Sequence, residues 1–339
     1  MMAKPLTRFF RPLLPRHLVY CDVGARGGVE AHPWRGLQPL IDTISFEPDE
    51  EEFRALARTL RDGDRLFNCA VHRQQGSMPL FLTKSRGCSS VYHPNRAFLR
   101  DFPETDRFEV EAEVQVRTER LDDFLSRQEV DRMDFVKIDV QGAGLDVLQG
   151  ATELLSRHLL GVEIEVEFQP LYVGQPLFAA VDSFLAKGFG LQLFDLRKAY
   201  WKRREGVGLG QCKGQLIFGD ALYLRPPEGV ASLLEGLDEE EAEAKVAMAC
   251  LIGLGYGYVD YVLALLDQGQ VAARLPAGLR RELRRIALGY GTCLRYRSWG
   301  SRVVAEVAAR VYRISQPSYH EWSASGHHLG SRKQFGMFY

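Results

Sequence analysis

The 339-residue chain lacks an apolar run of the roughly 20 residues that a membrane-spanning helix needs. It also lacks an excess of either charge: 43 basic and 44 acidic residues give a formal net charge of -1, which argues against bulk nucleic-acid binding. The prolines and arginines near the N-terminus interrupt any signal-peptide pattern. The six scattered cysteines form no C-x-x-C pair and no zinc-binding spacing. These absences predict a cytoplasmic protein with reduced cysteines and no nucleic-acid partner.

The first informative motif along the chain is a glycine-containing turn in residues 18–28. A short apolar run ends at Asp22, and Gly24, Gly27 and Gly28 follow. Such a pattern is typical of a buried strand that enters a tight turn, usually followed by a helix whose N–H groups bind a ligand. A dinucleotide site has the order G-x-G-x-x-G, whereas D-x-G-x-x-G-G suits S-adenosylmethionine (SAM) better. The alternative is a glycine-rich turn without a ligand.

A second acidic residue stands at the end of the next predicted strand, residues 43–47. Glu47 follows the glycine turn by roughly 20 residues, the spacing of a ribose-binding carboxylate. Asp49 can cap the helix that begins after it. Glu47 is therefore a candidate cofactor ligand, and a surface acid at a strand end is the alternative.

Strands and helices alternate from the first strand onward. The residue patterns predict strands at 18–23, 43–47, 65–72, 133–139 and 160–168, and a closing antiparallel pair at 189–196 and 215–224. Alternation of this kind predicts an α/β fold, with a mostly parallel sheet covered by helices on both faces. Ligands of such sheets bind beyond the carboxyl ends of the strands, so Asp22, Glu47 and residues 68–72 should converge.

The strand at 133–139 ends at Asp139, which we expect at the rim beside Asp22 and Glu47 and close to the reacting methyl group of SAM. Between the third strand and this one lies an insertion whose polar loop, residues 84–95, is typical of a loop over an active site. The alternative for this loop is an ordinary solvated surface.

Three glutamates alternate with apolar residues in the strand at 160–168. A central strand should not present three acids to a dry face, so we expect Glu165 or Glu167 to point into the site; a solvated edge is the alternative. Glu165 and Glu167, together with Gln141 and Tyr172, are our candidates for binding the methyl acceptor.

Five segments, at residues 22–25, 46–48, 121–124, 136–139 and 147–151, together resemble the FkbM family of SAM-dependent methyltransferases in order and spacing. The resemblance covers roughly residues 18–225. It implies a class I methyltransferase fold, which is Rossmann-like with a seven-stranded, mostly parallel sheet whose last strand is antiparallel. It also implies O-methylation of a sugar, a glycolipid or polysaccharide precursor, or a polyketide-like molecule.

The resemblance also implies roles for single residues. Asp22 and Gly24 would line the methionine end of SAM, Glu47 would bind the ribose, and Asp139 would lie next to the methyl group. Asn68 and Ala70 would lie near the adenine. The predicted cofactor-binding residues are therefore Asp22, Gly24, Ala25, Gly27, Glu47, Asn68, Ala70 and Asp139.

This chain departs from the family pattern at two positions. The family usually reads D-x-E-G-x-E in the block that begins at Asp139, and Gln141 and Gly144 stand at its two later acids. Glutamine keeps hydrogen bonding but cannot act as a base. The departures favour a second hypothesis, a catalytically degenerate protein that binds a partner through a helical part of the chain.

Methyl transfer to a hydroxyl requires alignment of the acceptor and removal of its proton. Asp139 is the first candidate for base or orienting group. His72 and His93 come next because histidine titrates near neutrality, although plain surface histidines are the alternative. A divalent metal held by Asp139 and Glu165 or Glu167 would also lower the pKa of the hydroxyl, but nothing in the spacing demands one.

Composition divides the chain into an arm (residues 1–17), a methyltransferase domain (18–228), a C-terminal helical domain (229–314) and a tail (315–339). Residues 235–245 carry six acids and one base, and residues 274–313 carry ten arginines and two acids. Arginine-rich helices suit a phosphate-bearing ligand, an anionic membrane or a partner chain, including a second copy. Solvated faces that pair with the acidic stretch are the alternative.

Overall fold

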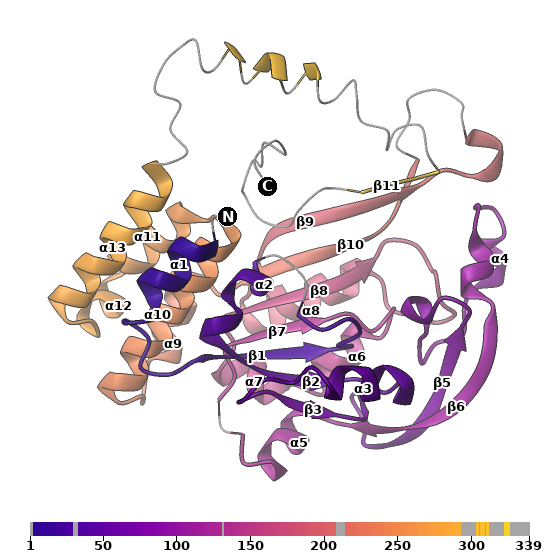
Figure 1. Cartoon of the computed structure of the whole chain (residues 1–339), viewed down its shortest axis with the longest axis horizontal. Coiled ribbons are helices and arrows are strands. Elements are labelled where there is room, and N and C mark those ends of the chain that lie inside the picture. The colour runs from indigo at the N-terminus through magenta and orange to yellow at the C-terminus, as the bar shows by residue number, and fades with distance from the viewer. Residues whose placement is uncertain are drawn as a thin grey trace.

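The computed structural model describes residues 3–29, 33–130, 132–207, 214–292, 303–304, 306–308, 310–311 and 322–325. Its centre is an eight-stranded sheet of order β11-β9-β10-β8-β7-β1-β2-β3 (Figure 1). The strands are β1 (Leu18–Val23), β2 (Ile41–Phe46), β3 (Arg65–Phe67), β7 (Phe135–Ile138), β8 (Gly161–Glu167), β9 (Gln192–Trp201), β10 (Gln215–Leu224) and β11 (Ser323–Ser325).

Across the sheet, the neighbouring strands β3, β2, β1, β7 and β8 are parallel to one another, and β10 is antiparallel to both β8 and β9. The expected seven-stranded sheet with a reversed last strand is therefore present, and β11 adds three residues at the edge of β9. The predicted closing pair is β9 and β10. Strand β9 continues to Trp201, beyond the predicted end at residue 196, because these residues pair with β10.

Each face of the sheet is covered by helices, because successive strand residues point to opposite sides. On one face Cys21, Val23 and Ile138 share a core with α5 (Leu121–Arg127), α6 (Gly144–Gln149), α7 (Thr152–Arg157) and α8 (Phe178–Phe189). On the other face Leu18, Tyr20 and Phe135 share a core with α1 (Ala3–Phe10), α2 (Trp34–Leu37) and α10 (Glu239–Tyr256).

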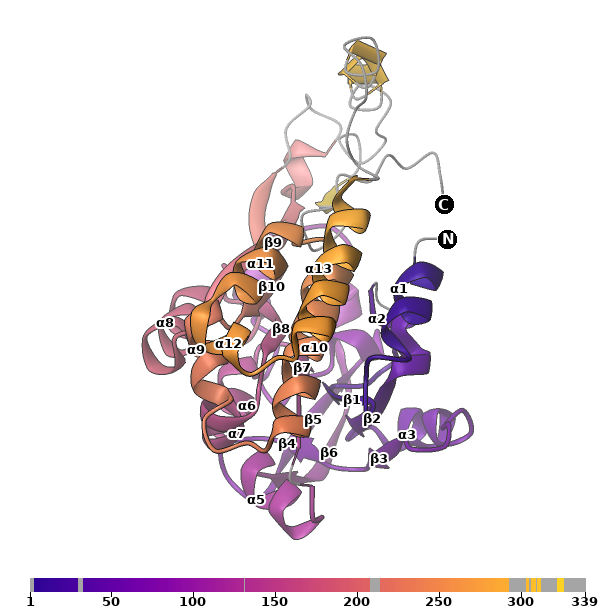
Figure 2. The same ribbon diagram turned by 90° about the vertical axis from the view of Figure 1, so that its left-hand side faces the viewer.

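The C-terminal helices are part of this second face. Helix α10 is buried from Ala244 to Tyr256 and packs with α9 (Pro227–Leu233), α11 (Val259–Asp267), α12 (Gly269–Ala273) and α13 (Ala277–Thr292). In Figure 1 these helices gather with α1 at one side of the molecule, and Figure 2 looks onto them. One hydrophobic core thus runs across the boundary at residue 228 that composition indicated. None of the helices in the described ranges has both the length and the apolar character needed to cross a bilayer.

The first helix described after β1 is the four-residue α2, whereas the glycine turn predicted a helix directly behind it. Trp34 fills the space over the sheet: its ring centroid lies 4.6 Å from those of Tyr20 and Phe135, and its Nε1 donates to the Tyr256 hydroxyl at 2.8 Å. Helix α10 therefore covers part of the β1 face near this turn.

The insertion forms a second, three-stranded sheet of order β4-β6-β5, which Figure 1 shows on the side opposite α13. Its strands are β4 (Ala70–Val71), β5 (Gly76–Thr83) and β6 (Val110–Glu119), and the segments between β5 and β6 contain η2 (Arg86–Cys88), α4 (Arg96–Leu99) and η3 (Thr105–Phe108). The single strand predicted at 65–72 is therefore two strands, β3 and β4, in different sheets. The break falls at Asn68, whose side-chain amide donates to the Glu47 carbonyl oxygen at 2.9 Å.

Candidate functional site

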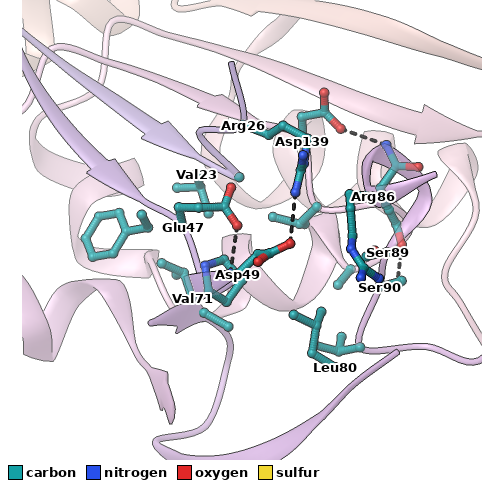
Figure 3. Close-up of a pocket in the computed structure, with 18 of the residues that line it drawn as sticks. Val23, Arg26, Glu47, Asp49, Val71, Leu80, Arg86, Ser89, Ser90 and Asp139 are labelled. Atoms are coloured by element: carbon teal, nitrogen blue, oxygen red, sulfur yellow. Dashed lines mark hydrogen bonds and ion pairs between the residues drawn. The ribbon is translucent and has the colours of Figure 1, made fainter. Parts of the chain in front are cut away.

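A cavity of about 970 Å³, counted out to its open mouth, lies at the carboxyl ends of β1, β2 and β7 (Figure 3). Among the predicted residues, Gly24, Glu47, Ala70, Asp139 and Gln141 line it. The loop expected to cover the site also lines it, through Arg86, Gly87, Ser89, Ser90 and Val91.

Gly24 is held where no other residue fits. Its φ is +79°, and a Cβ added there would lie 2.0 Å from the Asp139 carbonyl oxygen. The backbone N–H groups of Gly24 and Ala25 donate to the Phe46 carbonyl oxygen at 3.0 and 3.1 Å. The turn is therefore pressed between the ends of β2 and β7, which brings the Asp139 backbone against the glycine.

Arg26 joins this turn to helix α3 (Glu50–Ala57). Its guanidinium donates to Asp49 Oδ2 and to Glu52 Oε2, each at 2.9 Å, and the Gly27 N–H donates to Glu52 Oε1 at 3.0 Å. Asp49 also caps α3 by accepting from the Glu51 N–H, as its sequence position indicated. Sequence reasoning missed Arg26; an arginine inside the turn, facing the acidic start of α3, was the available signal.

Glu47 lies at the cavity wall and is 5% exposed. Its Oε1 accepts from the Asp49 N–H at 2.9 Å, which fixes the carboxylate. Burial raises the pKa of Glu47 to about 7. Asn68 does not line this cavity; it lies on an adjoining groove, where its amide supports the Glu47 and Pro48 carbonyl oxygens.

Asp22 lies beneath the turn, is 1% exposed, and does not line the cavity. Lys137 Nζ lies 3.5 Å from Asp22 Oδ1 and 3.6 Å from Asp139 Oδ2, so the lysine bridges the two acids. Burial raises the pKa of Asp22 to about 6, although Lys137 opposes the shift. Burial lowers the pKa of Lys137, but Asp22 and Asp139 outweigh it and raise that pKa above its ordinary value.

Gln141 connects the side chains predicted for the acceptor side. Its Nε2 donates to Asp139 Oδ1 at 2.9 Å and to Glu165 Oε1 at 2.7 Å, and the Tyr172 hydroxyl lies 3.0 Å from its Oε1. The Ser90 hydroxyl donates to the Gln141 carbonyl oxygen at 2.6 Å, which holds the covering loop against this network. Gln141 adopts φ +51°, an uncommon value outside glycine.

The three glutamates of β8 have different partners. Glu165 contacts Gln141, Glu167 is 3% exposed, and Glu163 accepts a hydrogen bond from the Tyr256 hydroxyl of α10. Burial raises the pKa of Glu165 well above its ordinary value and that of Glu167 to about 8, and the charge of Asp139 adds to both shifts. Burial also raises the pKa of Glu163 to about 7. Glu165 is therefore in the network of Asp139, whereas Glu163 serves contact with α10.

Neither predicted histidine is among the residues that line the cavity. His72 is buried with its Nε2 3.6 Å from Asp146 Oδ1, and burial lowers its pKa. His93 has Nδ1 3.0 Å from the Pro94 carbonyl oxygen and its ring against Phe81. Over the described ranges of the chain, no group of three or more histidine, cysteine or acidic residues has the arrangement to hold a metal ion.

Gly144 begins α6 in a tightly packed position. A Cβ there would lie 2.8 Å from Ile164 Cδ1. An acidic side chain at this position, as in the family pattern, would require the end of the Ile164 side chain to move.

The fold and the site together define the class of the protein. The order β3-β2-β1-β7-β8-β10-β9 with a reversed β10, and the glycine turn and acid at the ends of β1 and β2, are those of a class I methyltransferase. A family model described as the methyltransferase FkbM domain matches residues 22–192, about half of the chain, and the chain belongs to this family.

Three similar proteins carry methyltransferase names. The 2-O-methyltransferase NoeI of Sinorhizobium fredii (strain NBRC 101917 / NGR234) is 29% identical over 173 residues, which are 48% of this chain and 70% of that protein. Methyltransferase sdnD of Sordaria araneosa is 28% identical over 162 residues (41% and 62%), and methyltransferase 1 of Beauveria bassiana (strain ARSEF 2860) is 27% identical over 140 residues (38% and 56%). The chain thus matches less than two thirds of the length of the last two.

Among solved structures, precorrin-6y C5,15-methyltransferase from Geobacter metallireducens GS-15 aligns with a TM-score of 0.31 and 11% identity, over 66% of this chain and 87% of that one. The 23S rRNA methyltransferase ErmE aligns with a TM-score of 0.28 and 13% identity, over 84% and 97%.

Proposed function

We propose that the cavity binds SAM and that the protein transfers its methyl group to a hydroxyl of a sugar, a glycolipid or polysaccharide precursor, or a polyketide-like molecule. The observation that carries the proposal is that Gly24, Glu47 and Asp139 surround one cavity. The name of NoeI, a 2-O-methyltransferase, supports oxygen as the acceptor atom.

The residues present fit this cofactor. The side-chain-free wall at Gly24 lets a ligand approach the backbone, and the fixed carboxylate of Glu47 is suited to accept hydrogen bonds from ribose hydroxyls. Ala70 gives the cavity a small apolar wall toward the adenine end, beside Val71 and Leu80. Asp22, which lies under the turn, forms an ion pair with Lys137, and Arg26 bonds to Asp49 and so ties the turn to the start of α3.

On the acceptor side, SAM supplies an electrophilic methyl group on a sulfonium centre, and the protein must orient a hydroxyl and take its proton. Asp139 lines the cavity with a side chain 35% exposed, so an acceptor can reach it. Its Oδ1 accepts from Gln141, and Lys137 lies beside Oδ2, which holds the carboxylate in one orientation. Asp139 is therefore a better candidate than His72 or His93 for the base or orienting group. Gln141, which also lines the cavity, can bind a further hydroxyl of the acceptor, whereas Glu165 and the buried Tyr172 do not line it and act by holding Gln141.

A second candidate function is a non-catalytic binding or assembly module. It is favoured by Gln141, which replaces an acid of the family pattern, and by Gly144, where an acidic side chain would meet Ile164. This candidate keeps the fold and the cavity but predicts no methyl transfer to any acceptor.

The test is to incubate the protein with methyl-labelled SAM and panels of neutral glycosides, glycolipid precursors and polyketide alcohols, and to detect labelled ethers by mass spectrometry. Asp139→Asn should lower turnover far more than SAM affinity, and Asp123→Asn, a partly exposed acid of α5, is the matched control. Loss of SAM affinity alone in Asp139→Asn would assign the residue to the cofactor. SAM binding without transfer to any panel would favour the binding module.

A further inference from the structure

A row of charged side chains crosses four strands of the main sheet beside the cavity. In the strand register, Glu165 of β8 is opposite Asp220 of β10, which in turn is opposite Arg197 of β9. Asp139 takes the place next to Glu165, because it directly follows β7, which pairs in parallel with β8 up to Ile138. The row therefore extends from the cavity wall at Asp139 over β8, β10 and β9, which Figure 1 shows side by side.

Both ends of this row carry a compensating cation. At the cavity end, Lys137 Nζ lies 3.6 Å from Asp139 Oδ2. At the far end, Arg197 Nη2 lies 2.6 Å from Asp220 Oδ2. The negative charge of these two aspartates is thus offset within the protein.

The two glutamates between these pairs, Glu165 and Glu167, have no ion pair with any residue that the structure describes. Glu165 Oε1 accepts from the neutral amide of Gln141, and no hydrogen bond to the other oxygen of Glu165 is found in the described ranges. Glu167 is 3% exposed, and its Oε1 has no hydrogen-bond partner there either. A buried carboxylate oxygen without a donor is costly, so this arrangement indicates a ligand that brings donors of its own.

The two glutamates face the same space, because residues two apart in a strand point to the same side. The Gly142 N–H favours the ionised form of Glu167, which places this carboxylate against the turn that follows Asp139. Burial raises the pKa of Glu165 well above its ordinary value, and the charges of three surrounding acids add to the shift: Asp139, Glu167 and Asp220. A positively charged group among these acids would relieve their mutual repulsion.

The geometry favours an organic cation over a divalent metal ion. Gln141 Nε2 lies between Asp139 and Glu165 and donates to both, so these carboxylates do not converge on one point. Over the described parts of the chain, no three potential ligands have an arrangement that holds a metal ion. An ammonium group has three N–H donors on rotatable bonds and accepts a looser set of oxygens.

We propose that the methyl acceptor carries a protonated amino group, which binds at Glu165 and Glu167 while its hydroxyl reaches Asp139. The acceptor is then an amino sugar or a related amino alcohol. This inference rests on the proposed function, because it places the amino group beside the SAM cavity. The path between the two subsites is open to an acceptor, since the Asp139 side chain is 35% exposed and Glu165 is partly exposed.

The test compares matched probes on the full chain. The probes are amino sugars and amino alcohols, glucosamine among them, each with a counterpart that has a hydroxyl or an N-acetyl group in place of the amine. In calorimetric titrations with the demethylated product of SAM bound, we expect each amine that binds to exceed its neutral counterparts at least about tenfold in affinity. With methyl-labelled SAM, the label should appear on oxygen, because a protonated amine has no free electron pair.

Charge-removing variants of the same size locate the subsite. Glu165→Gln and Glu167→Gln should each lower the ratio of amine to neutral affinity at least about tenfold. Glu163→Gln is the matched control, because Glu163 lies on the same face of β8 but accepts from the Tyr256 hydroxyl. The control should change the ratio less than about threefold, since it acts only through distance. The SAM affinity of every variant reports whether it is folded.

The outcomes separate this inference from the proposed function. Equal affinity for amines and neutral counterparts, no binding of any amine, or an equal fall of the ratio in Glu163→Gln would overturn the inference. Methylation of neutral glycosides without preference for amines would leave the proposed function standing and overturn only the amino subsite. Amine binding that Glu165→Gln and Glu167→Gln abolish, without any methyl transfer, would support the subsite and contradict the transferase activity.

Discussion

At the residue scale, Gln141 gives the clearest account of how this chain departs from its family. Its amide stands between Asp139 and Glu165 and donates a hydrogen bond to each. An acid at this position would place a third carboxylate beside two others and would add repulsion in a buried setting. The glutamine therefore keeps the geometry of the network while removing one negative charge, and Asp139 is the acid of this network that lines the cavity.

Gly24 offers a direct test of the turn. Gly24→Ala would bring a Cβ to 2.0 Å from the Asp139 carbonyl oxygen, so we expect at least a tenfold (about 1.4 kcal/mol) loss of SAM affinity and a lower unfolding midpoint. Gly27→Ala is the matched control, because Gly27 also has positive φ, +75°, but has nothing within 4 Å of an added Cβ. Calorimetric titration and urea unfolding of both variants decide the matter; equal effects would mean that backbone strain, and not the close approach, explains the glycine.

The carboxyl group of Glu47 should affect the affinity for SAM and make that affinity depend on pH. Glu47→Ala should weaken SAM binding by about 1–3 kcal/mol, because hydrogen bonds to a charged group are lost. Since its pKa is raised to about 7, the carboxyl group is protonated below that pH and ionised above it. Only the ionised form accepts from both ribose hydroxyls, so SAM affinity should rise as pH increases through about 7 and then level off.

Titrations with SAM at several pH values would check this, with Glu47→Gln as the control that should flatten the profile. A pH dependence that persists in Glu47→Gln would assign it to another group, such as Asp22.

At the scale of elements, a buried charge cluster ties the N-terminal arm and α10 to the start of β7. Asp134 is fully buried and lies 2.8 Å from Arg16 and 2.7 Å from Lys245. Although burial raises its pKa, Lys245 and Arg16 lower it to about 2. Asp134 therefore stays ionised and joins three segments that are distant in the chain.

We expect Asp134→Ala to lower the free energy of unfolding by about 3–5 kcal/mol, because it leaves Lys245 charged, buried and without its main partner. Asp267→Ala should leave the unfolding midpoint unchanged within error, although Asp267 also pairs with two arginines, because that cluster is at the surface. Urea unfolding of the two variants checks this. Equal effects would show that the Asp134 cluster is not a structural anchor.

The features best predicted from the sequence are those that depend on a short run of residues, such as a strand and the acid that follows it. Strands β1, β2 and β7 were visible as apolar runs that stop next to or just before Asp22, Glu47 and Asp139, and parallel pairing brings their carboxyl ends together, although Asp22 lies beneath the turn and not at the cavity. The break between β3 and β4 was not predictable, since it depends on Asn68 bonding to carbonyl groups 20 or more residues away. The placement of His72 away from the cavity follows from its packing beside Asp146, which no local pattern reveals.

At the scale of the whole molecule, the C-terminal helices complete the fold. Leu18, Tyr20 and Phe135 of the sheet share one core with residues along α10, from Ala242 to Tyr256. The composition change near residue 228 indicated a separate helical domain because composition shows where a pattern changes but not which surfaces meet. The family model ends at residue 192, before this region, so the resemblance gave no guide to it.

A chain ending at residue 228 should therefore not fold into a stable unit. Without α10, the apolar face formed by Tyr20, Trp34 and Phe135 would be open to water. We expect such a fragment to aggregate, or to bind a hydrophobic dye and unfold without a cooperative transition. A soluble fragment with a cooperative transition and intact SAM affinity would show instead that residues 18–228 are an independent domain.

The central claim is that the cavity beside Gly24, Glu47 and Asp139 is a SAM site. The most direct measurement is a calorimetric titration of the purified full chain with SAM and with its demethylated product, with NAD as the control. We predict one site per chain, micromolar affinity for SAM and its product, and no heat of binding with NAD. A folded protein that binds neither SAM nor its product would contradict the account and favour the non-catalytic module.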